Sequence, residues 1–151
     1  MGMDFNFPNF KCFIFSHLTL ILTVFIGACI STLSFIFTKN IPLDIYFSDS
    51  LPTHFFQIFI HNLTFLIIYS IPFVGHVYYL YAFLVIFVAI GMHVNHLGLY
   101  NTLLKLWHLP IEIYAFSLMI DSSFKPIKKR IKPSLTATLC LLISAIIEFY
   151  I

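Results

Sequence analysis

The residues that could do chemistry in this chain are a few histidines and carboxylic acids among long apolar stretches. His108 is followed four residues later by Glu112, and His93 and His96 are three residues apart. Imidazole and carboxylate groups bind zinc, and a glutamate can act as general base to a metal-bound water. Glu112 and His108 are therefore candidate catalytic residues, and His93, His96 and His108 are weak candidate metal ligands. A divalent metal fits as a cofactor, but it is not the favoured interpretation because the HExxH motif is absent.

A proline separates the two members of the His108–Glu112 pair. Pro110 favours the first turn of a helix, and a proline disfavours helical backbone in the residue before it, here Leu109. The sequence alone therefore does not require His108 and Glu112 to share one face of a helix.

More polar side chains recur along the apolar stretch 55–76 and just before it. Several are three or four residues apart, which places them on one stripe of a helix, with Asn62 beside that stripe. An ionisable residue within a membrane costs about 2.5–3.5 kcal/mol and tends to face the interior of a bundle. We therefore expect Glu112 to contact a polar group of this stretch. Its candidate partners are His61, Asn62 and His108. The candidate binding residues are His54, Gln57, His61, Asn62, His108 and Glu112.

Three interpretations of these polar residues remain open. They could form hydrogen bonds between helices, as polar side chains do in membrane bundles. They could line a cavity that binds a peptide or a lipid headgroup, or they could form a metal or catalytic site. The GxSxG, P-loop and GxGxxG motifs are absent, so no nucleotide-binding or serine-hydrolase motif decides among them.

The composition sets the environment in which these residues must work. Of 151 residues, 60% are hydrophobic and only 9% are charged, and the mean hydropathy is +0.98. An ordinary soluble domain has about 25% charged residues, and a disordered chain has low hydrophobicity; both classes are excluded. The net charge of +2 does not indicate nucleic-acid binding. The sequence predicts an integral membrane protein.

Five apolar stretches predict five helical spans in one transmembrane domain, residues 1–151. A bilayer-spanning helix needs about 20 apolar residues, and backbone groups in lipid must be satisfied within the helix. The fold class is therefore all-α, a polytopic helix bundle. The fourth stretch is short and either spans the membrane or is re-entrant. The predicted spans are 13–38, 55–76, 77–94, 110–124 and 134–151.

The distribution of charge and of small residues predicts the orientation and one packing surface. The segment 125–133 holds the basic cluster Lys-Pro-Ile-Lys-Lys-Arg-Ile-Lys-Pro, and basic loops stay in the cytoplasm. Five spans then place the N-terminus in the cytoplasm and the C-terminus outside. Gly27, Ser31 and Ser34 lie on roughly one helical face and predict close packing against another helix.

Four places in the chain resemble the stage II sporulation protein M family of small polytopic membrane proteins. The stretch 56–62 resembles the family's apolar segment that ends in asparagine, and Gly75 and Gly91 resemble two family glycines. The segment 108–115, His-Leu-Pro-Ile-Glu-Ile-Tyr-Ala, resembles the family signature His-Gly-x-x-Glu-x-x-Ala, with Leu109 in place of the glycine. The match covers about residues 55–121.

The resemblance implies which residues matter and what kind of role they have. The family's conserved pair maps to His108 and Glu112, with Asn62 as a third member. Family members are associated with envelope remodelling in sporulation, and short ones resemble accessory proteins encoded with circular bacteriocins, which implies maturation, export or immunity. We therefore expect a non-enzymatic accessory protein of an envelope or peptide-handling assembly. Its expected partners are the lipid bilayer and other membrane proteins or a peptide.

Two alternatives belong to other functional classes. The first is a membrane-embedded hydrolase or peptide cyclase that uses Glu112 and neighbouring histidines. The second is the membrane subunit of a transporter that works with a separate ATPase, because the chain has no nucleotide-binding motif.

Overall fold

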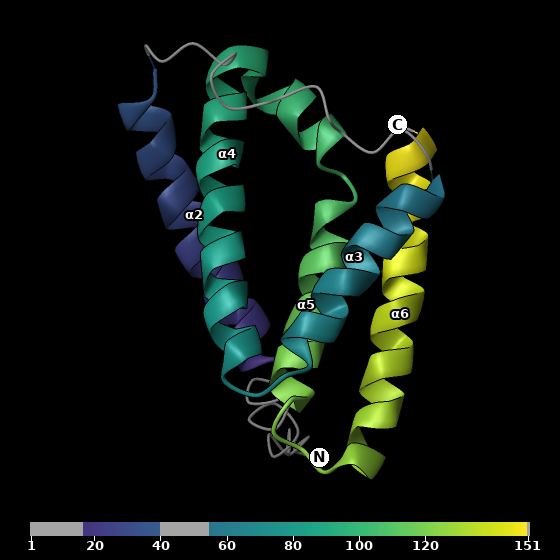
Figure 1. The fold of residues 1–151 in the computed structure, drawn as a ribbon. Helices are drawn as coiled ribbons and strands as arrows, with labels where there is room; N and C mark the ends of the chain where they lie inside the picture. The colour runs from purple at the N-terminus through teal and green to yellow at the C-terminus, as the bar shows by residue number, and fades with distance from the viewer. Residues whose placement is uncertain (1–16, 40–54, 151) are drawn as a thin grey trace, which may run out of the picture.

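The computed structural model describes residues 17–39 and 55–150, and these residues form an all-α helical bundle. Figure 1 shows α2 and α4 side by side, with α3, α5 and α6 grouped beside them. The predicted fold class is confirmed, and the described residues contain no strand. The helices are α2 (Leu18–Phe37), α3 (Phe55–Tyr69), α4 (Val74–Lys105), α5 (Leu109–Ser122) and α6 (Ile127–Tyr150).

Contacts between helices show in which direction each one runs. The helices α2 and α4 are parallel, because Thr23 contacts Tyr79 and, farther along both helices, Ser34 contacts Val88. The helices α5 and α6 are antiparallel, since the start of α5 lies against the end of α6. The bundle therefore has two ends. We call the end that holds the start of α5 and the end of α6 the upper end, as it is drawn in Figure 1.

Among the described residues, three helices are long and apolar enough to cross a membrane: α2, α4 and α6. The other two are shorter, with 15 residues in α3 and 14 in α5. At 1.5 Å per residue these helices are about 21–23 Å long, which is less than the roughly 30 Å of a bilayer's hydrocarbon core. The described part of the chain thus has the apolar helices of a membrane protein, together with two shorter helices, α3 and α5.

Two helices extend beyond the predicted spans. The third span was expected at 77–94, but α4 continues to Lys105 with a break at Gly98, whose φ of 78° and ψ of 159° favour glycine. The segment 95–105 is therefore helical rather than a loop. The fifth span was expected from residue 134, but α6 begins at Ile127 and includes the basic cluster. The helix α6 continues through Pro133, which lies in its interior as the seventh residue although proline disfavours such a position.

The contact between α2 and α4 is made by small residues, as the sequence predicts. Ser31 donates a hydrogen bond of 2.8 Å to the carbonyl of Phe87, and Ser34 donates one of 2.7 Å to the carbonyl of Val88. A Cβ added at Gly91 would lie 2.3 Å from the backbone oxygen of Ser31. Small side chains therefore let the two helical backbones approach closely, which is how membrane helices associate in lipid.

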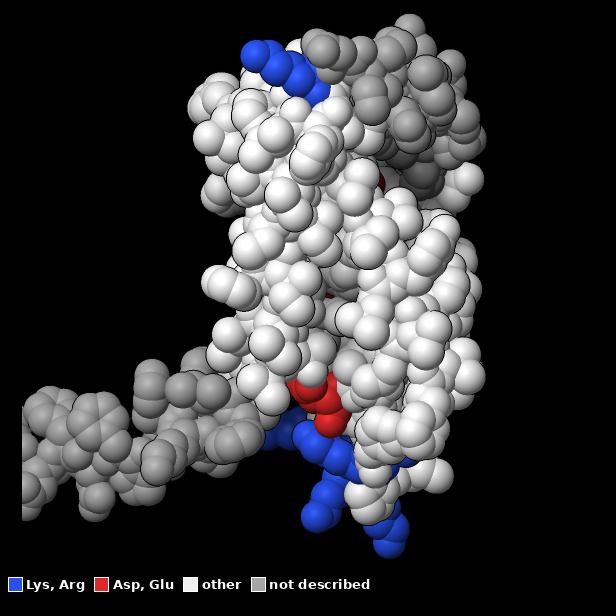
Figure 2. Space-filling view, turned by 90° about the vertical axis from the view of Figure 1, so that its left-hand side faces the viewer, with Lys and Arg blue, Asp and Glu red and all other residues white. Residues whose placement is uncertain are grey.

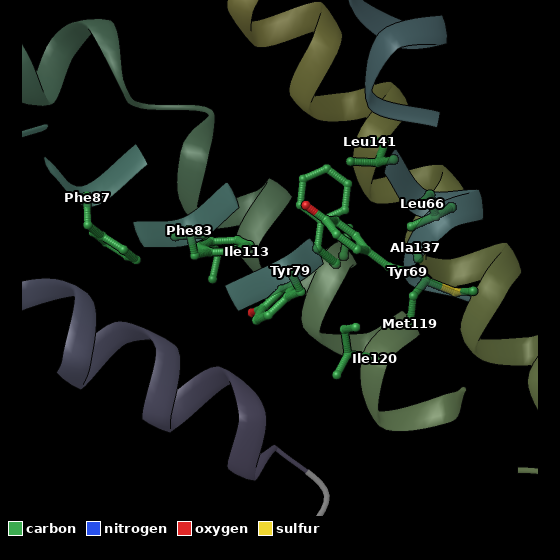
Figure 3. Packing of buried hydrophobic residues seen from close by; sticks show 12 residues of the cluster. Leu66, Tyr69, Tyr79, Phe83, Phe87, Ile113, Met119, Ile120, Ala137 and Leu141 are labelled. Carbon is green, nitrogen blue, oxygen red and sulfur yellow. The ribbon is translucent and has the colours of Figure 1, made fainter. Parts of the chain in front are cut away.

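The helix α5 lies at the centre of the bundle and is the most enclosed one. Eight of its residues are buried, including Glu112 and Ser117. Figure 3 shows the surrounding apolar core, in which Tyr69 of α3 and Tyr79 of α4 lie near Ile113 and Ile120 of α5. The core positions α5, and α5 in turn positions the polar residues at the upper end.

Candidate functional site

Glu112 is the polar centre of the upper end. Its side chain is 8% exposed and lies in the first turn of α5. The amide of Asn62, from α3, donates a hydrogen bond to its Oε1, and the hydroxyl of Ser144, from α6, donates a second one of 3.0 Å to the same oxygen. Glu112 therefore joins three helices, and the prediction that it contacts a polar group of the second stretch is confirmed.

His108 and Glu112 lie one helical turn apart despite the intervening proline. His108 precedes α5 with helical backbone angles, φ −74° and ψ −27°. The backbone N–H of Glu112 donates to the carbonyl of His108 over 3.3 Å. Pro110 occupies the first turn, where a backbone N–H has no partner within the helix, so it does not interrupt the helix. Leu109 is thus the first residue of α5 although it precedes a proline.

A third group completes this arrangement from the end of α6. The Oε2 of Glu148 lies 3.8 Å from the Nε2 of His108. The ligating atoms of His108, Glu112 and Glu148 all lie within 4.8 Å of one another, and no other three metal-ligating side chains of the described residues form such a group. The weak candidates His93 and His96 are therefore not part of it. We call His108, Glu112 and Glu148 the upper cluster.

The imidazole of His108 is held with one nitrogen unsatisfied. Its side chain is 12% exposed. Its Nδ1 atom is buried and has no hydrogen-bond partner among the described residues. Burial lowers the pKa of His108, because the charged form is disfavoured away from water. Burial thus favours the neutral imidazole, which is the form that can accept a proton or bind a metal ion.

A cavity of about 450 Å³ opens beside the upper cluster, between α3, α4 and α5. Its wall is mostly apolar and aromatic, with His61, Asn62, His93, His108 and Glu112 as polar members. Binding sites for small molecules have this character, with a few polar groups in an apolar wall. The apolar part of the wall includes Phe65, Tyr69, Tyr78, Tyr81, Ala82, Val85, Ile86, Ala89, Ile90 and Phe116.

The predicted binding residues are divided between the cavity and the outside of the bundle. Asn62 is buried, whereas Gln57 and His61 on the expected stripe are exposed. His61 still borders the cavity and packs edge-on against the ring of Phe65, with the ring centroids 4.7 Å apart. His54 lies outside the described residues. The side chain that holds Glu112 is therefore the asparagine beside the stripe.

The two predicted metal candidates of α4 lie apart from the upper cluster. His93 borders the cavity, and its Nδ1 lies 2.9 Å from the carbonyl of Ala89, one turn earlier on the same helix. His96 is exposed. Neither contributes to a group of three ligands within the described residues.

Two residues of the site were not among the sequence candidates. Ser144 and Glu148 are four residues apart, so they lie on the same face of α6. Their spacing was visible in the sequence, but the sequence does not give the register in which α6 packs against α5. A second polar contact lies at the lower end, where Thr19 donates a hydrogen bond to Asp121.

Comparison with known proteins identifies no relative of this chain. The functional proposal therefore rests on the upper cluster, its two hydrogen-bonding neighbours and the cavity beside them. No family model, no curated protein and no solved structure matches the sequence or the fold.

Proposed function

We propose that the chain is a multi-pass protein of a bacterial plasma membrane, with its N-terminus in the cytoplasm. Figure 2 shows a white, uncharged middle with lysine and arginine side chains at the two ends, and more of them at the lower end. The basic residues from Lys125 to Lys132 belong to that end. Among the described residues, Lys39 and Lys105 are the basic ones elsewhere. This asymmetry supports a cytoplasmic lower end.

We further propose that the protein is a non-enzymatic accessory of a peptide-handling or envelope assembly and that its cavity holds an apolar peptide segment. The observation that carries this proposal is the placement of Glu112. It is a buried carboxylate, fixed by Asn62 and Ser144, at the polar edge of an aromatic cavity. A peptide presents apolar side chains together with backbone N–H groups that must find acceptors in an apolar environment. A fixed carboxylate is such an acceptor.

The family resemblance supports the same assignment. His108, Glu112 and Asn62 are the residues to which the signature of the stage II sporulation protein M family draws attention, and they lie together at the upper end. Bacteriocin maturation, export or immunity, and envelope remodelling, are the roles that follow from this resemblance. Each of them requires contact with a peptide or another membrane protein.

The test is photochemical labelling with a defined peptide. An apolar synthetic peptide that carries photoreactive leucine is mixed with the purified protein in lipid nanodiscs containing EDTA, and labelled positions are read by mass spectrometry. We expect labelling at the less exposed cavity residues Ile86 and Ile90, with competition by excess unlabelled peptide. The variant Ala89→Phe places a ring in the cavity and keeps Glu112 itself unchanged, and it should remove this labelling.

The matched control places the same change on a lipid-facing surface. Ala28→Phe adds a ring to an exposed position of α2 and should leave cavity labelling unchanged. Phe56 is 71% exposed and reports labelling from the lipid phase. If labelling spreads evenly over lipid-facing residues, or if Ala89→Phe labels as strongly as the natural sequence, the cavity does not bind the peptide.

A second candidate function, a membrane-embedded hydrolase or peptide cyclase, is favoured by one observation. The upper cluster offers an imidazole and two carboxylates within 4.8 Å of one another beside the cavity. Such groups serve as general acids, general bases or metal ligands. Turnover of a peptide that depends on Glu148, with Glu148→Gln still folded and still labelled by the peptide, would favour the enzyme over the accessory protein.

A further inference from the structure

The upper cluster has the composition and the geometry of a metal site. Its members come from both sides of one helix contact: His108 and Glu112 from the start of α5, and Glu148 from the last turns of α6. One imidazole and two carboxylates form a ligand set that suits zinc and neighbouring divalent transition metals. We propose that His108, Glu112 and Glu148 bind one divalent metal ion at the upper end of the bundle.

The electrostatics of the cluster favour a cation. Glu112 is 8% exposed, and the side chain of Glu148 is 30% exposed. Two carboxylates this close in a medium of low dielectric constant repel each other, unless a proton or a cation is shared between them. A divalent cation between the two carboxylates would remove the repulsion, and the third group of the cluster, an imidazole, adds a ligand that suits such an ion.

The hydrogen bonds around the cluster leave ligand atoms available. Both side-chain bonds to Glu112, from Asn62 and Ser144, end on Oε1, so neither of them occupies Oε2. The Nδ1 of His108 is buried without a partner among the described residues. The Nε2 atom of His108 faces Glu148 at 3.8 Å and is the ring nitrogen placed to bind the ion. Asn62 and Ser144 then act as the outer hydrogen-bonding groups that orient a ligating carboxylate.

The distances require a small adjustment. Metal–ligand bonds of 2.0–2.2 Å place ligand atoms about 3.5 Å apart in a tetrahedral site, whereas these atoms lie within 4.8 Å of one another. A contraction of roughly 1 Å is therefore needed. Glu148 can supply it, because its side chain is partly exposed and lies two residues before the end of α6. Three protein ligands leave a further position for water or for a group of a ligand in the cavity.

The site is tested with Zn²⁺ alone. The full chain is purified in detergent through a tag without histidine, treated with EDTA, freed of chelator and titrated with ZnCl₂ in a calorimeter. We expect one ion per chain. Glu148→Gln and His108→Ala should each weaken the binding of Zn²⁺ by at least about tenfold, because each removes a direct ligand. Co²⁺ in place of Zn²⁺ should show visible absorption bands that Glu148→Gln alters.

The control is His96→Ala, which removes an exposed histidine from outside the cluster and should leave the affinity for Zn²⁺ unchanged. Glu148→Gln is the principal variant because it keeps the shape of a partly exposed side chain and leaves the bonds of Glu112 in place. If the chain takes up no ion with one-to-one stoichiometry, or if Glu148→Gln and His108→Ala bind as well as the natural sequence, there is no metal site. The peptide-labelling test contains EDTA, so its outcome is independent of this one.

Discussion

Replacing Glu112 tests whether this residue ties three helices together. Glu112→Leu removes the acceptor of the Asn62 and Ser144 hydrogen bonds. Interhelical hydrogen bonds in membrane proteins contribute about 0.6 kcal/mol on average, and up to about 1.7 kcal/mol. Asn62 is 8% exposed, so its amide is left buried without this acceptor at a cost of about 1–3 kcal/mol. We expect Glu112→Leu to lower the free energy of unfolding by about 2–4 kcal/mol.

Glu112→Gln separates shape from charge. Glutamine keeps a side-chain oxygen that can accept from Asn62 and Ser144, so the loss should stay below about 1 kcal/mol. Ser144→Ala removes one bond only and should cost about 0.6 kcal/mol. The natural sequence should therefore be the most stable, Glu112→Gln and Ser144→Ala should be intermediate, and Glu112→Leu should be the least stable.

The measurement is unfolding of the purified protein in mixed micelles by increasing mole fractions of dodecyl sulfate, with EDTA present throughout. Trp107 is the single tryptophan of the chain, is 64% exposed and precedes His108, so its fluorescence reports on the upper end. A double-mutant cycle with Asn62→Leu isolates the pair. We expect a coupling of about 1 kcal/mol between Asn62 and Glu112.

Two results would refute this reasoning. A Glu112→Leu variant within about 0.5 kcal/mol of the natural sequence would show that the hydrogen bonds of Glu112 do not hold α3 and α6 to α5, since they should contribute more than that. Strict additivity of Asn62→Leu and Glu112→Leu would show that the two side chains do not interact in the folded protein.

Four further predictions concern other parts of the fold. Gly91→Leu should lower the free energy of unfolding by about 2–4 kcal/mol in the same micelle assay, because its Cβ would meet the backbone of α2; a stability equal to the natural one would contradict the close α2–α4 contact. Gly98→Ala should cost about 1–3 kcal/mol through backbone strain alone, since its φ of 78° and ψ of 159° suit only glycine and nothing lies within 4 Å of the added Cβ; no measurable loss would contradict this backbone conformation. Asp121→Leu should lower the free energy of unfolding by about 0.5–1.5 kcal/mol, because it loses the hydrogen bond from Thr19. Asp121→Asn keeps an oxygen that can accept this bond and should lower it much less. An alkaline phosphatase fused after Ile151 should be active and a cytoplasmic reporter there inactive; the opposite pattern would reverse the proposed orientation.

Much of the architecture follows from the sequence because lipid demands helices and sets their length. The apolar stretches and the small residues of α2 were predictable. The contact of Glu112 with the second stretch was predictable too, because a carboxylate in lipid must find a partner. These features depend on how lipid solvates each segment. They can therefore be predicted from one segment at a time.

The side of each helix that faces its neighbours was harder to predict. In water, polar residues mark the outer face, but lipid is as apolar as a protein core, so hydropathy does not separate the two faces. The α3 stripe illustrates this: Gln57 and His61 are exposed while Asn62 is buried. Neighbouring residues of a helix point in directions that differ by about 100°. Packing against α5 therefore decides which of them faces the bundle.

The helix boundaries and the α6 contribution to the site depended on tertiary packing. The predicted third span ends at 94 and the predicted fifth begins at 134, whereas α4 ends at Lys105 and α6 begins at Ile127. Glu148 joins His108 only because α5 and α6 pack antiparallel in one register. That register is a property of two segments together, so neither segment alone indicates it.

The hydroxyl-to-carbonyl bonds between α2 and α4 have a consequence for sequence divergence. Ser34 donates to the backbone carbonyl of Val88, an atom that every amino acid carries. Natural homologues can therefore change Val88 to another apolar residue without losing this bond. They cannot enlarge Ser34 or Gly91 in the same way, because a Cβ at Gly91 would already lie 2.7 Å from the Cβ of Ser34. We therefore expect homologues to vary at Val88 and to keep small residues at the positions of Ser34 and Gly91.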